Sequence, residues 1–381
     1  MEKVNKPMGI YIHIPFCSRK CDYCDFVSYS MNRKAQELYL DALCTEIDMV
    51  KNQYAECTFN SIFIGGGTPS IVYEGFIAGL SRKLYSSFKF EPKTEFTIEV
   101  NPASFTKEKF FEYVEAGANR ISVGVQCLDK KLLANHGRIQ SIENVKNAFK
   151  ILRNSQFANV NSDVMIGLPG QTKKSVVQTI KFLIKNKVKH ISTYSLQVER
   201  HTMLYDKIRR GKVRPMNDKR QLDIYNKVYK LLKKNGFSRY ELSNFAKPGF
   251  QCEHNKKYWN ETNYLGLGVS AHSYVDGYRF YNTKRLDTYI DKMAQGKSAV
   301  YSREYISIED RRTERIMLSL RTVQGLNLKE FEKDFKEDLL LTHGNAISKL
   351  VDLNMVKLED GYLKITEDYF YVSNSIIVEL L

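Results

Sequence analysis

Three cysteines near the N-terminus have the spacing best suited to metal chemistry. Cys17, Cys21 and Cys24 form the pattern C-x3-C-x2-C. Thiolates are the soft ligands that iron–sulfur clusters take, and one short loop can supply three corners of a cubane. The spacing therefore predicts a [4Fe-4S] cluster in which one iron has no protein sulfur. Zinc with His13 as a fourth ligand is the alternative, although the sequence has no paired C-x2-C knuckles of the usual zinc kind.

The remaining cysteines have no such pattern. An odd total of seven, with three crowded together, fits a reducing compartment and metal ligation better than a disulfide framework. A scattered cysteine is most often a small buried apolar residue. We expect this role for Cys44, Cys57, Cys127 and Cys252.

A charge within an apolar run and a glycine-rich turn add polar chemistry to the first half of the chain. Asp163 interrupts the run Val160–Leu168, where an unpaired buried charge would be costly. It is either a ligand-binding carboxylate or a strand-end charge that meets a lysine. The turn Gly65–Thr68 begins with three glycines, and without Cβ atoms its backbone could come close to a ligand.

The elements that must position these residues form a repeating pattern. Short β-rich runs alternate with helical stretches from residue 9 to about 200, which is typical of βα units around a parallel sheet. Thr106 and Ser141 are good N-cap residues, and Gly117 is a good C-cap. The predicted strands are Gly9–Phe16, Asn60–Ile64, Glu95–Val100, Arg120–Val125, Asn159–Ile166 and His190–Leu196. The pattern predicts an α/β fold with a partial (β/α)6 barrel, whose chemistry gathers at the carboxyl ends of the strands.

The chain after the barrel changes character twice. A helix is predicted over Asn217–Lys234, and residues 240–281, rich in Gly, Asn and aromatics, are expected to be irregular and to cover one mouth of the barrel. The tail predicts a small winged-helix-like α+β domain, with helices Glu309–Leu320, Leu328–Phe335 and Ala346–Leu353 and a hairpin turning at Asp360–Gly361. We therefore divide the chain into a barrel (1–235), a covering segment (236–304) and a C-terminal domain (305–381).

Composition excludes some classes of protein and leaves others open. With 43% hydrophobic and 27% charged residues, the chain is ordinary for a soluble protein. No apolar run approaches the roughly 18 residues of a membrane span, and Met1–Met8 has no apolar core of a secretory signal. We expect a cytoplasmic protein. The net charge of +15 is spread along the chain, so it allows peripheral contact with anionic lipid but specifies no partner.

The motifs, taken in order, resemble the radical S-adenosylmethionine (SAM) superfamily, in the branch of oxygen-independent coproporphyrinogen III oxidases. The resemblance covers most of the chain from Tyr11 onward, and its motifs are Tyr11-Ile-His-Ile-Pro-Phe-Cys17, the cysteine loop, Gly65-Gly-Gly-Thr68, Gln126, Arg138 and Asp163. It implies that SAM chelates the open iron through its amino and carboxylate groups. An electron from the cluster would then cleave SAM to a 5′-deoxyadenosyl radical.

The resemblance also implies roles for single residues. Gly66, Gly67 and Thr68 would approach the methionine part of SAM. Glu99 would accept the ammonium, Arg138 would hold the carboxylate in a bidentate fork, and Gln126 and Asp163 would bond the ribose hydroxyls. Tyr11 and Tyr23 flank the cluster loop and would pack on the loop or on adenine, unless they are plain core or rim aromatics.

A second motif lies after the barrel. The run His254-Asn-Lys-Lys-Tyr258-Trp259 matches the H-N-x-x-Y-W pattern of the HemW-type heme chaperones, relatives of the oxidases. Imidazole is a normal axial ligand of heme iron, and Tyr258 and Trp259 offer flat apolar faces to a porphyrin. Cys252 and His272 are other candidate ligands. Without the family pattern, a hydrogen-bonded structural histidine would be the more common case.

Two departures decide between the branches. Phe26 stands where the oxidases have a fourth cysteine, and the chain reaches Cys17 without their longer N-terminal arm. We therefore expect a heme chaperone that binds heme as cargo and passes it to an acceptor protein, with a flavodoxin or ferredoxin as the type of electron donor. Radical SAM oxidation of coproporphyrinogen III or a related tetrapyrrole is the alternative. Nucleic-acid binding through the tail ranks last, because no basic recognition helix stands out.

Overall fold

The computed structural model describes residues 7–30 and 32–381. The expectation about a secretory signal concerns Met1–Met8 and therefore falls almost wholly outside these residues. Within the described ranges, no helix is both long and apolar enough to cross a membrane.

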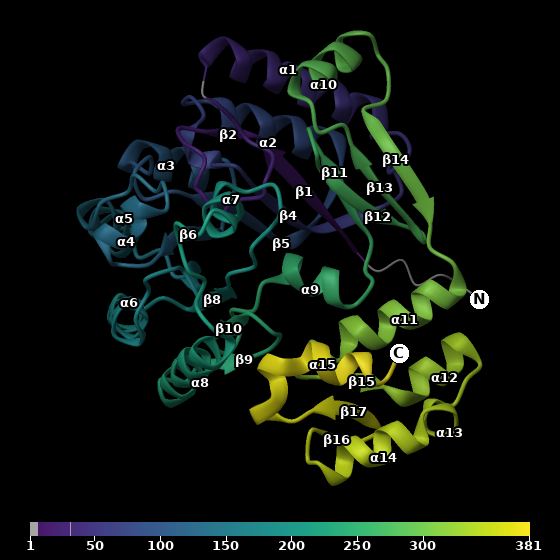
Figure 1. Ribbon diagram of the computed structural model, residues 1–381. Helices are drawn as coiled ribbons and strands as arrows, with labels where there is room; N and C mark the ends of the chain where they lie inside the picture. The colour runs from purple at the N-terminus through teal and green to yellow at the C-terminus, as the bar shows by residue number, and fades with distance from the viewer. Residues whose placement is uncertain (1–6, 31) are drawn as a thin grey trace.

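A twelve-stranded mixed sheet forms the main body (Figure 1). Its middle consists of six strands that pair in parallel and in chain order. These are β1 (Met8–Ile14), β4 (Thr58–Gly66), β5 (Lys89–Val100), β6 (Arg120–Gln126), β7 (Val160–Ile166) and β8 (His190–Ser195). All six predicted strands are confirmed, and they form the partial barrel.

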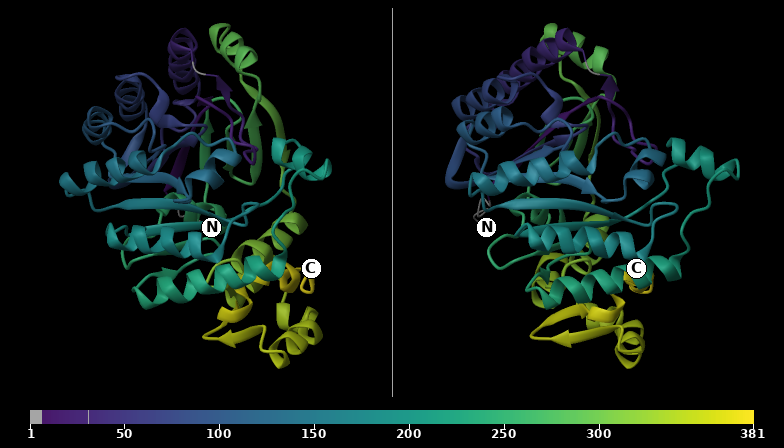
Figure 2. Two further views of the ribbon diagram at one scale, coloured as in Figure 1. Left: turned by 60° about the vertical axis from the view of Figure 1, so that its left-hand side comes forward. Right: turned by 90° about the vertical axis from the view of Figure 1, so that its left-hand side faces the viewer.

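Two short helices, α4 (Lys130–Asn135) and α7 (Met203–Arg209), lie beside the carboxyl ends of the strands and share a small separate apolar cluster. The longer helices cover the outer face of the sheet (Figure 2). They are α1 (Arg33–Val50), α2 (Phe76–Ser87), α3 (Lys107–Glu115), α5 (Ile142–Asn154), α6 (Lys173–Lys185) and α8 (Asp218–Lys234). The predicted caps are confirmed: the Thr106 hydroxyl accepts from Lys109 N, Ser141 forms a capping box with Asn144, and Gly117 has φ +99°.

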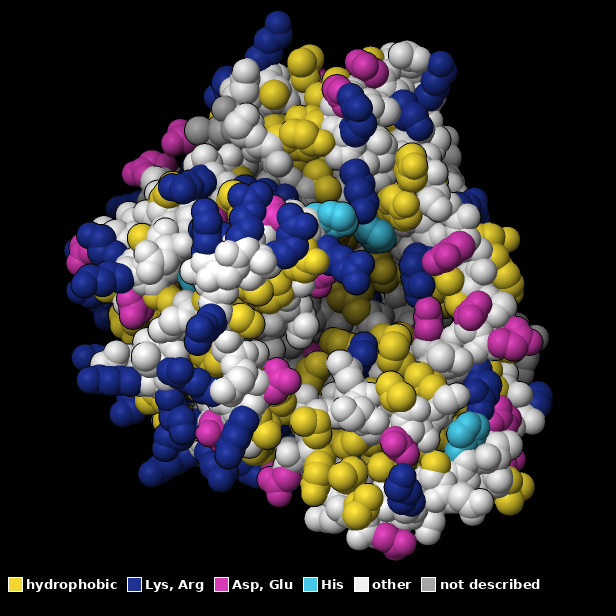
Figure 3. All heavy atoms as spheres, viewed as in Figure 1, with side chains coloured by type: hydrophobic (Ala, Val, Ile, Leu, Met, Phe, Trp, Pro, Cys, Tyr) yellow, Lys and Arg dark blue, Asp and Glu magenta, His cyan; other side chains and the backbone are white. Residues whose placement is uncertain are grey.

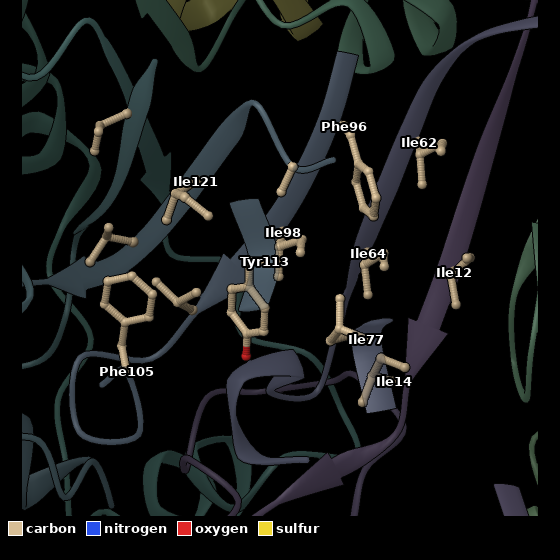
Figure 4. Packing of buried hydrophobic residues seen from close by; sticks show 14 of the residues in the cluster. Ile12, Ile14, Ile62, Ile64, Ile77, Phe96, Ile98, Phe105, Tyr113 and Ile121 are labelled. Carbon is tan, nitrogen blue, oxygen red and sulfur yellow. The ribbon is translucent and has the colours of Figure 1, made fainter. Parts of the chain in front are cut away.

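The main core lies between the sheet and these helices. Alternate strand residues such as Ile12, Ile62, Ile98 and Ile121 point outward and are completely buried (Figure 4). Because successive side chains of a strand point to opposite faces, the intervening residues line the inside of the barrel. This inner set is mostly polar and includes Gly9, Tyr11, His13, Ser61, Phe63, Glu95, Thr97, Glu99, Arg120, Ser122, Asn161, Asp163, Met165, His190, Ser192 and Tyr194.

The segment expected to be irregular instead extends the sheet at both edges. Its elements are β9 (Ser238–Arg239), β10 (Asn244–Ala246), α9 (Glu253–Trp259), β11 (Tyr264–Leu267), β12 (His272–Val275), β13 (Tyr278–Asn282), α10 (Leu286–Ala294) and β14 (Val300–Tyr305). β10 pairs antiparallel with β8, and β11 pairs parallel with β1, followed outward by β12, β13 and β14. The expectation was wrong because these strands have only two to six residues, too few for a clear sequence period.

The C-terminal domain has its own apolar core and a three-stranded antiparallel sheet. Its elements are α11 (Ile308–Ser319), β15 (Leu326–Asn327), α12 (Leu328–Phe335), α13 (Leu339–Thr342), α14 (Gly344–Asp352), β16 (Val356–Glu359), β17 (Tyr362–Ile365) and α15 (Ser373–Val378). The three predicted helices and the hairpin are confirmed, and Asp360 and Gly361 both have the positive φ of a tight hairpin turn. α13 and α15 were not predicted. The boundaries at 235 and 304 stay predictions.

Candidate functional site

A cavity of about 530 Å³ opens at the carboxyl ends of the parallel strands. Parallel α/β barrels place their chemistry at this end because the loops that follow the strands converge there. Most of the predicted cofactor residues line the cavity: Cys17, Cys21, Tyr23, Cys24, Gly66, Gly67, Thr68, Glu99, Gln126, Arg138 and Asp163.

The cysteine loop is held in place from several sides. The short parallel strands β2 (Phe16–Cys17) and β3 (Tyr29–Ser30) join its two ends. In its middle, the Asp22 backbone donates to His136 O at 3.0 Å and accepts from Leu204 N at 2.8 Å. The Asp22 side chain forms an ion pair with Lys207 of α7. These contacts therefore fix the backbone of the loop that carries the three thiols.

Burial keeps the thiols of Cys17 and Cys24 protonated by raising their pKa values. It raises the pKa of Cys24 to about 11 and also raises that of Cys17, whose Sγ lies 3.5 Å from Thr68 Oγ1. Both are neutral thiols at physiological pH, so binding a metal to them releases protons. Among the described residues, no three His, Cys, Asp or Glu side chains converge on one point that could hold a single ion.

Arg138 lies directly beside these thiols. Its Nη1 is 3.4 Å from Tyr23 Oη and 4.0 Å from Cys21 Sγ. Its Nη2 donates to Gly124 O at 2.5 Å and its Nε to Gln140 Oε1 at 2.8 Å. Burial raises the pKa of Tyr23 to about 12, although the nearby guanidinium opposes this shift. The fork is thus oriented by the protein, and Nη1 faces the cysteines.

Two carboxyl groups stand deeper in the cavity. Burial, with a further contribution from the Asp163 charge, raises the pKa of Glu99 to about 8, while Gly66 N donates to Glu99 Oε2 at 3.2 Å. Asp163 accepts from Asn161 Nδ2 at 2.9 Å and from Ser122 Oγ at 3.2 Å, and burial raises its pKa as well. Asp163 is therefore held by neutral partners and not by a lysine, contrary to the alternative considered from the sequence.

The glycines of the turn are needed for protein packing. A Cβ on Gly66, which has φ +105°, would lie 2.6 Å from the His13 ring. On Gly67 it would lie 2.8 Å from Phe16 O. The close approach predicted for a ligand is thus first a close approach of this turn to β1 and to β2, which follows it.

Gln126 has an unsatisfied atom in the cavity wall. Its Oε1 is buried and has no hydrogen-bond partner, and its backbone has φ +61°, which is uncommon outside glycine. A buried acceptor without a partner is costly unless a ligand or water donates to it. This arrangement fits a ligand hydroxyl.

One predicted residue lies elsewhere. Tyr11 is not part of the cavity wall, because it is two residues before His13 on β1 and so faces the barrel interior one layer deeper. Its hydroxyl bonds His13 Nδ1 at 3.0 Å. Sequence reasoning missed other residues of the cavity wall, among them Asn101, Met165 and Tyr194. Each lies at or just after the carboxyl end of a strand, and that position was the signal available for finding them.

Helix α9 carries the second motif, and its histidine is fully enclosed. His254 is completely buried, with Nδ1 bonded to Ser61 Oγ at 3.0 Å and Nε2 to Tyr258 Oη at 3.0 Å. Its ring also stacks on Phe63 at 5.2 Å. Burial lowers the pKa of His254 to about 3, so the imidazole is neutral. Both nitrogens are already used, so in this arrangement neither is free to bind iron.

The start of α9 is fastened by a carboxylate inside the barrel. Glu95 accepts from the backbone of Glu253 at 3.0 Å and of His254 at 3.1 Å, and Cys252 Sγ donates to it at 3.2 Å. Cys252 is therefore not a free ligand either. Trp259, half-buried, lines a separate cavity of about 730 Å³ between the barrel and the C-terminal domain. The motif residues thus point in different directions.

The sequence matches two family models. Residues 11–183 match the radical SAM superfamily, and residues 306–368 match the HemN C-terminal domain. The radical SAM enzyme described as coproporphyrinogen III oxidase (HemN) from Escherichia coli has a similar structure, with a TM-score of 0.86 and 22% sequence identity over 99% of this chain and 90% of that chain. This similarity concerns the fold.

Curated relatives match nearly the whole length. The heme chaperone HemW of Lactococcus lactis is 31% identical over 99% of this chain and 98% of its own, and that of Bacillus subtilis is 31% identical over 96% and 97%. The HemW of Buchnera aphidicola from Schizaphis graminum is 36% identical over 71% of this chain and 70% of its own. The chain therefore belongs to the HemW family of the radical SAM superfamily.

Proposed function

We propose that this protein is a heme chaperone that binds heme and passes it to an acceptor protein, built on a radical SAM scaffold with a [4Fe-4S] cluster and SAM. The observation that carries the proposal is the combination of full-length similarity to proteins named heme chaperone HemW with a cavity that gathers the cysteine loop and a polar ligand wall. The acceptor is a protein that the sequence does not name.

The donor set supports a cluster more than a zinc ion. Tetrahedral zinc needs ligands that converge on one ion, whereas the cysteines of a cubane bind different iron atoms and stand further apart. Cys17, Cys21 and Cys24 line one cavity without converging on a single point. When bound, such a cluster supplies one electron at a time to a ligand on its open iron.

The remaining cavity residues would bind and orient SAM. Arg138 holds its guanidinium against the cysteine loop and can donate from Nη1 to a carboxylate, while the orphaned Gln126 Oε1 and the fixed Asp163 carboxylate can accept from ribose hydroxyls. Glu99 can accept from the amino group of the ligand once its carboxyl is ionised. Tyr23 covers the same side, and Gly66, Gly67 and Thr68 close the wall next to the cysteines.

Other parts of the function are also proposals. The cluster would receive its electron from a flavodoxin or ferredoxin in the cytoplasm, and the net charge of +15 favours an acidic partner of this kind or weak contact with anionic lipid. The heme-binding role of His254, Tyr258 and Trp259 stays a prediction. For His254 it requires that α9 first gives up its bonds to Ser61 and Tyr258.

Heme titration followed by transfer tests the function. Untagged full-length protein with its reconstituted cluster is titrated anaerobically with heme, and the loaded protein is then mixed with an apo-hemoprotein. We expect stoichiometric binding and movement of the Soret absorbance to the acceptor. A protein that binds no heme, or binds it without release to any acceptor, contradicts the proposal.

A further inference from the structure

The inner face of the sheet continues beyond the barrel, and one histidine on it is free. Paired strand residues point to the same face of a sheet. Tyr11 of β1 pairs with Gly266 of β11, and His272 of β12 pairs with Tyr281 of β13. Gly266 lies against the backbone of His272, where a Cβ would sit 2.1 Å from the His272 carbonyl oxygen. These residues therefore form one row across the inner face.

His272 differs from the other histidines of this chain. His13, His136, His190, His254 and His343 each have a ring nitrogen in a hydrogen bond. His201 and His272 are exposed and make no ring hydrogen bond to the described residues. Of these two, only His272 has an aromatic neighbour: its ring stacks on Tyr281, with centroids 4.8 Å apart and planes at 20°.

The surroundings of His272 suit a flat anionic ligand. The Tyr281 ring lies 5.8 Å from the ring of Tyr301, whose side chain is 71% exposed, so the aromatic surface continues onto β14. Lys284 Nζ lies 5.8 Å from the Tyr281 ring centroid and has no ion-pair partner among the described residues. Figure 3 shows a hollow in the face turned toward the viewer, with histidine, basic and hydrophobic side chains around it.

The imidazole also has the protonation state that iron requires. Partial desolvation by its neighbours lowers the pKa of the exposed His272 ring, and the charges of Lys284 and Arg279 lower it further. A neutral imidazole keeps a lone pair for a metal at physiological pH. Arg279 is already paired with Glu314 at 2.8 Å, so Lys284 is the cation left for an anionic group.

We propose that heme binds on the inner face of β12 and β13, with the His272 imidazole as an axial ligand of its iron, the Tyr281 ring beside the porphyrin and Lys284 toward a propionate. The inference rests on the proposed function and assigns its cargo to a site outside the motif helix α9. His254 then fastens α9 to the barrel and takes no direct part in holding the iron.

Three single variants of the untagged full-length protein, with the cluster reconstituted, test this site by anaerobic titration with heme. His272→Ala should lower heme affinity by about tenfold or more and shift the Soret band, because an axial ligand is lost. His201→Ala is the matched control, since it removes the other exposed and unbonded imidazole, and it should leave affinity and spectrum unchanged. His272→Gly should regain the wild-type spectrum when free imidazole is added.

The outcomes separate this inference from the proposed function. Unchanged heme affinity and spectrum in His272→Ala, with wild type binding normally, would refute the site and leave the chaperone function standing. A spectral change in His254→Ala alone would assign the iron to α9 instead. A wild type that binds no heme would overturn both proposals. Because the His272 ring is exposed, makes no hydrogen bond and loses only its stacking on Tyr281, His272→Ala should stay folded with nearly the thermal stability of wild type, so misfolding will not imitate the loss of heme.

Discussion

At the scale of single residues, the cysteine loop makes the most direct prediction. Replacing Cys17, Cys21 or Cys24 by Ala should abolish the reconstituted cluster, because a cubane held by two thiolates loses a third of its protein bonds. Iron and sulfide analysis with the visible absorption spectrum measures this. Cys44→Ala is the control, since that half-buried thiol lies on α1 outside the cavity. Full cluster content in all three loop variants would exclude the site.

The proposed contacts of Arg138 and Asp163 lead to a prediction about the affinity of the protein for SAM. Arg138→Ala and Asp163→Asn should each weaken SAM binding by about tenfold or more, since a hydrogen bond to a charged group contributes roughly 1.5–3 kcal/mol. Equilibrium binding to the cluster-loaded protein is the measurement, and cluster content should stay the same in both variants. Wild-type affinity in both would show that these side chains serve the protein alone.

The raised pKa of Glu99 leads to a prediction about how the affinity for SAM depends on pH. With its pKa raised to about 8, Glu99 is mostly protonated at neutral pH, and accepting from the amino group of SAM requires its ionised form. Raising the pH should therefore strengthen binding by about eightfold between roughly pH 6.5 and 7.5, with a plateau only above about pH 9. The control is Glu99→Gln, because titration of the ligand's own amine is common to both proteins. The same pH profile in both would rule out this role.

At the scale of elements, helix α9 shows how a motif can serve structure. His254 bonds Ser61 of β4 and Tyr258 of its own helix, and Glu95 of β5 receives the first backbone amides of α9. The helix has only seven residues, so these contacts and not its own length keep it folded.

His254→Ala should therefore lower the free energy of unfolding by about 1–3 kcal/mol, because it leaves buried partners without a hydrogen bond. Chemical denaturation measures the change. His201→Ala, at an exposed position, should cost almost nothing. Equal stability of the two variants would show that His254 does not fasten the helix.

Sequence reasoning located the elements whose apolar pattern runs over many residues and missed most of the short strands that have no clear pattern. Several elements were predicted because residues close together in the sequence specify them, through apolar periodicity or turn chemistry. These are the six parallel strands, the caps at Thr106 and Ser141 and the C-terminal hairpin. The pairing of β11 with β1 was not predicted, since it joins residues about 250 positions apart through a four-residue strand. At the cavity, Tyr11 lies one layer below the wall, because the family motif names a residue without naming its depth along the inner face of the strand.

At the scale of the whole molecule, the same architecture serves proteins described as an oxidase and as heme chaperones. A shared fold does not imply a shared reaction, so the site must decide. Phe26 is 60% exposed at the rim of the cavity, at the position where the oxidases have a fourth cysteine.

We expect the reconstituted protein not to convert coproporphyrinogen III to protoporphyrinogen IX. Anaerobic incubation with SAM and reductant, followed by chromatography of the porphyrins, measures this. An authentic oxidase run in parallel provides the positive control. Product that increases in proportion to the amount of this protein would favour the oxidase.

The outermost strand, β14, has a consequence for the solubility of the molecule. It is hydrogen-bonded on one side only, to β13, and its other backbone edge is a template on which a foreign strand could add. Tyr301 and Tyr305 favour such association, because 71% and 65% of their aromatic side chains are exposed along that edge. Arg303 and Glu304 interrupt the aromatic row, and charges on an edge strand are a common protection against aggregation. Arg303 and Glu304 are thus the charges on this edge strand that oppose the addition of strands from other molecules.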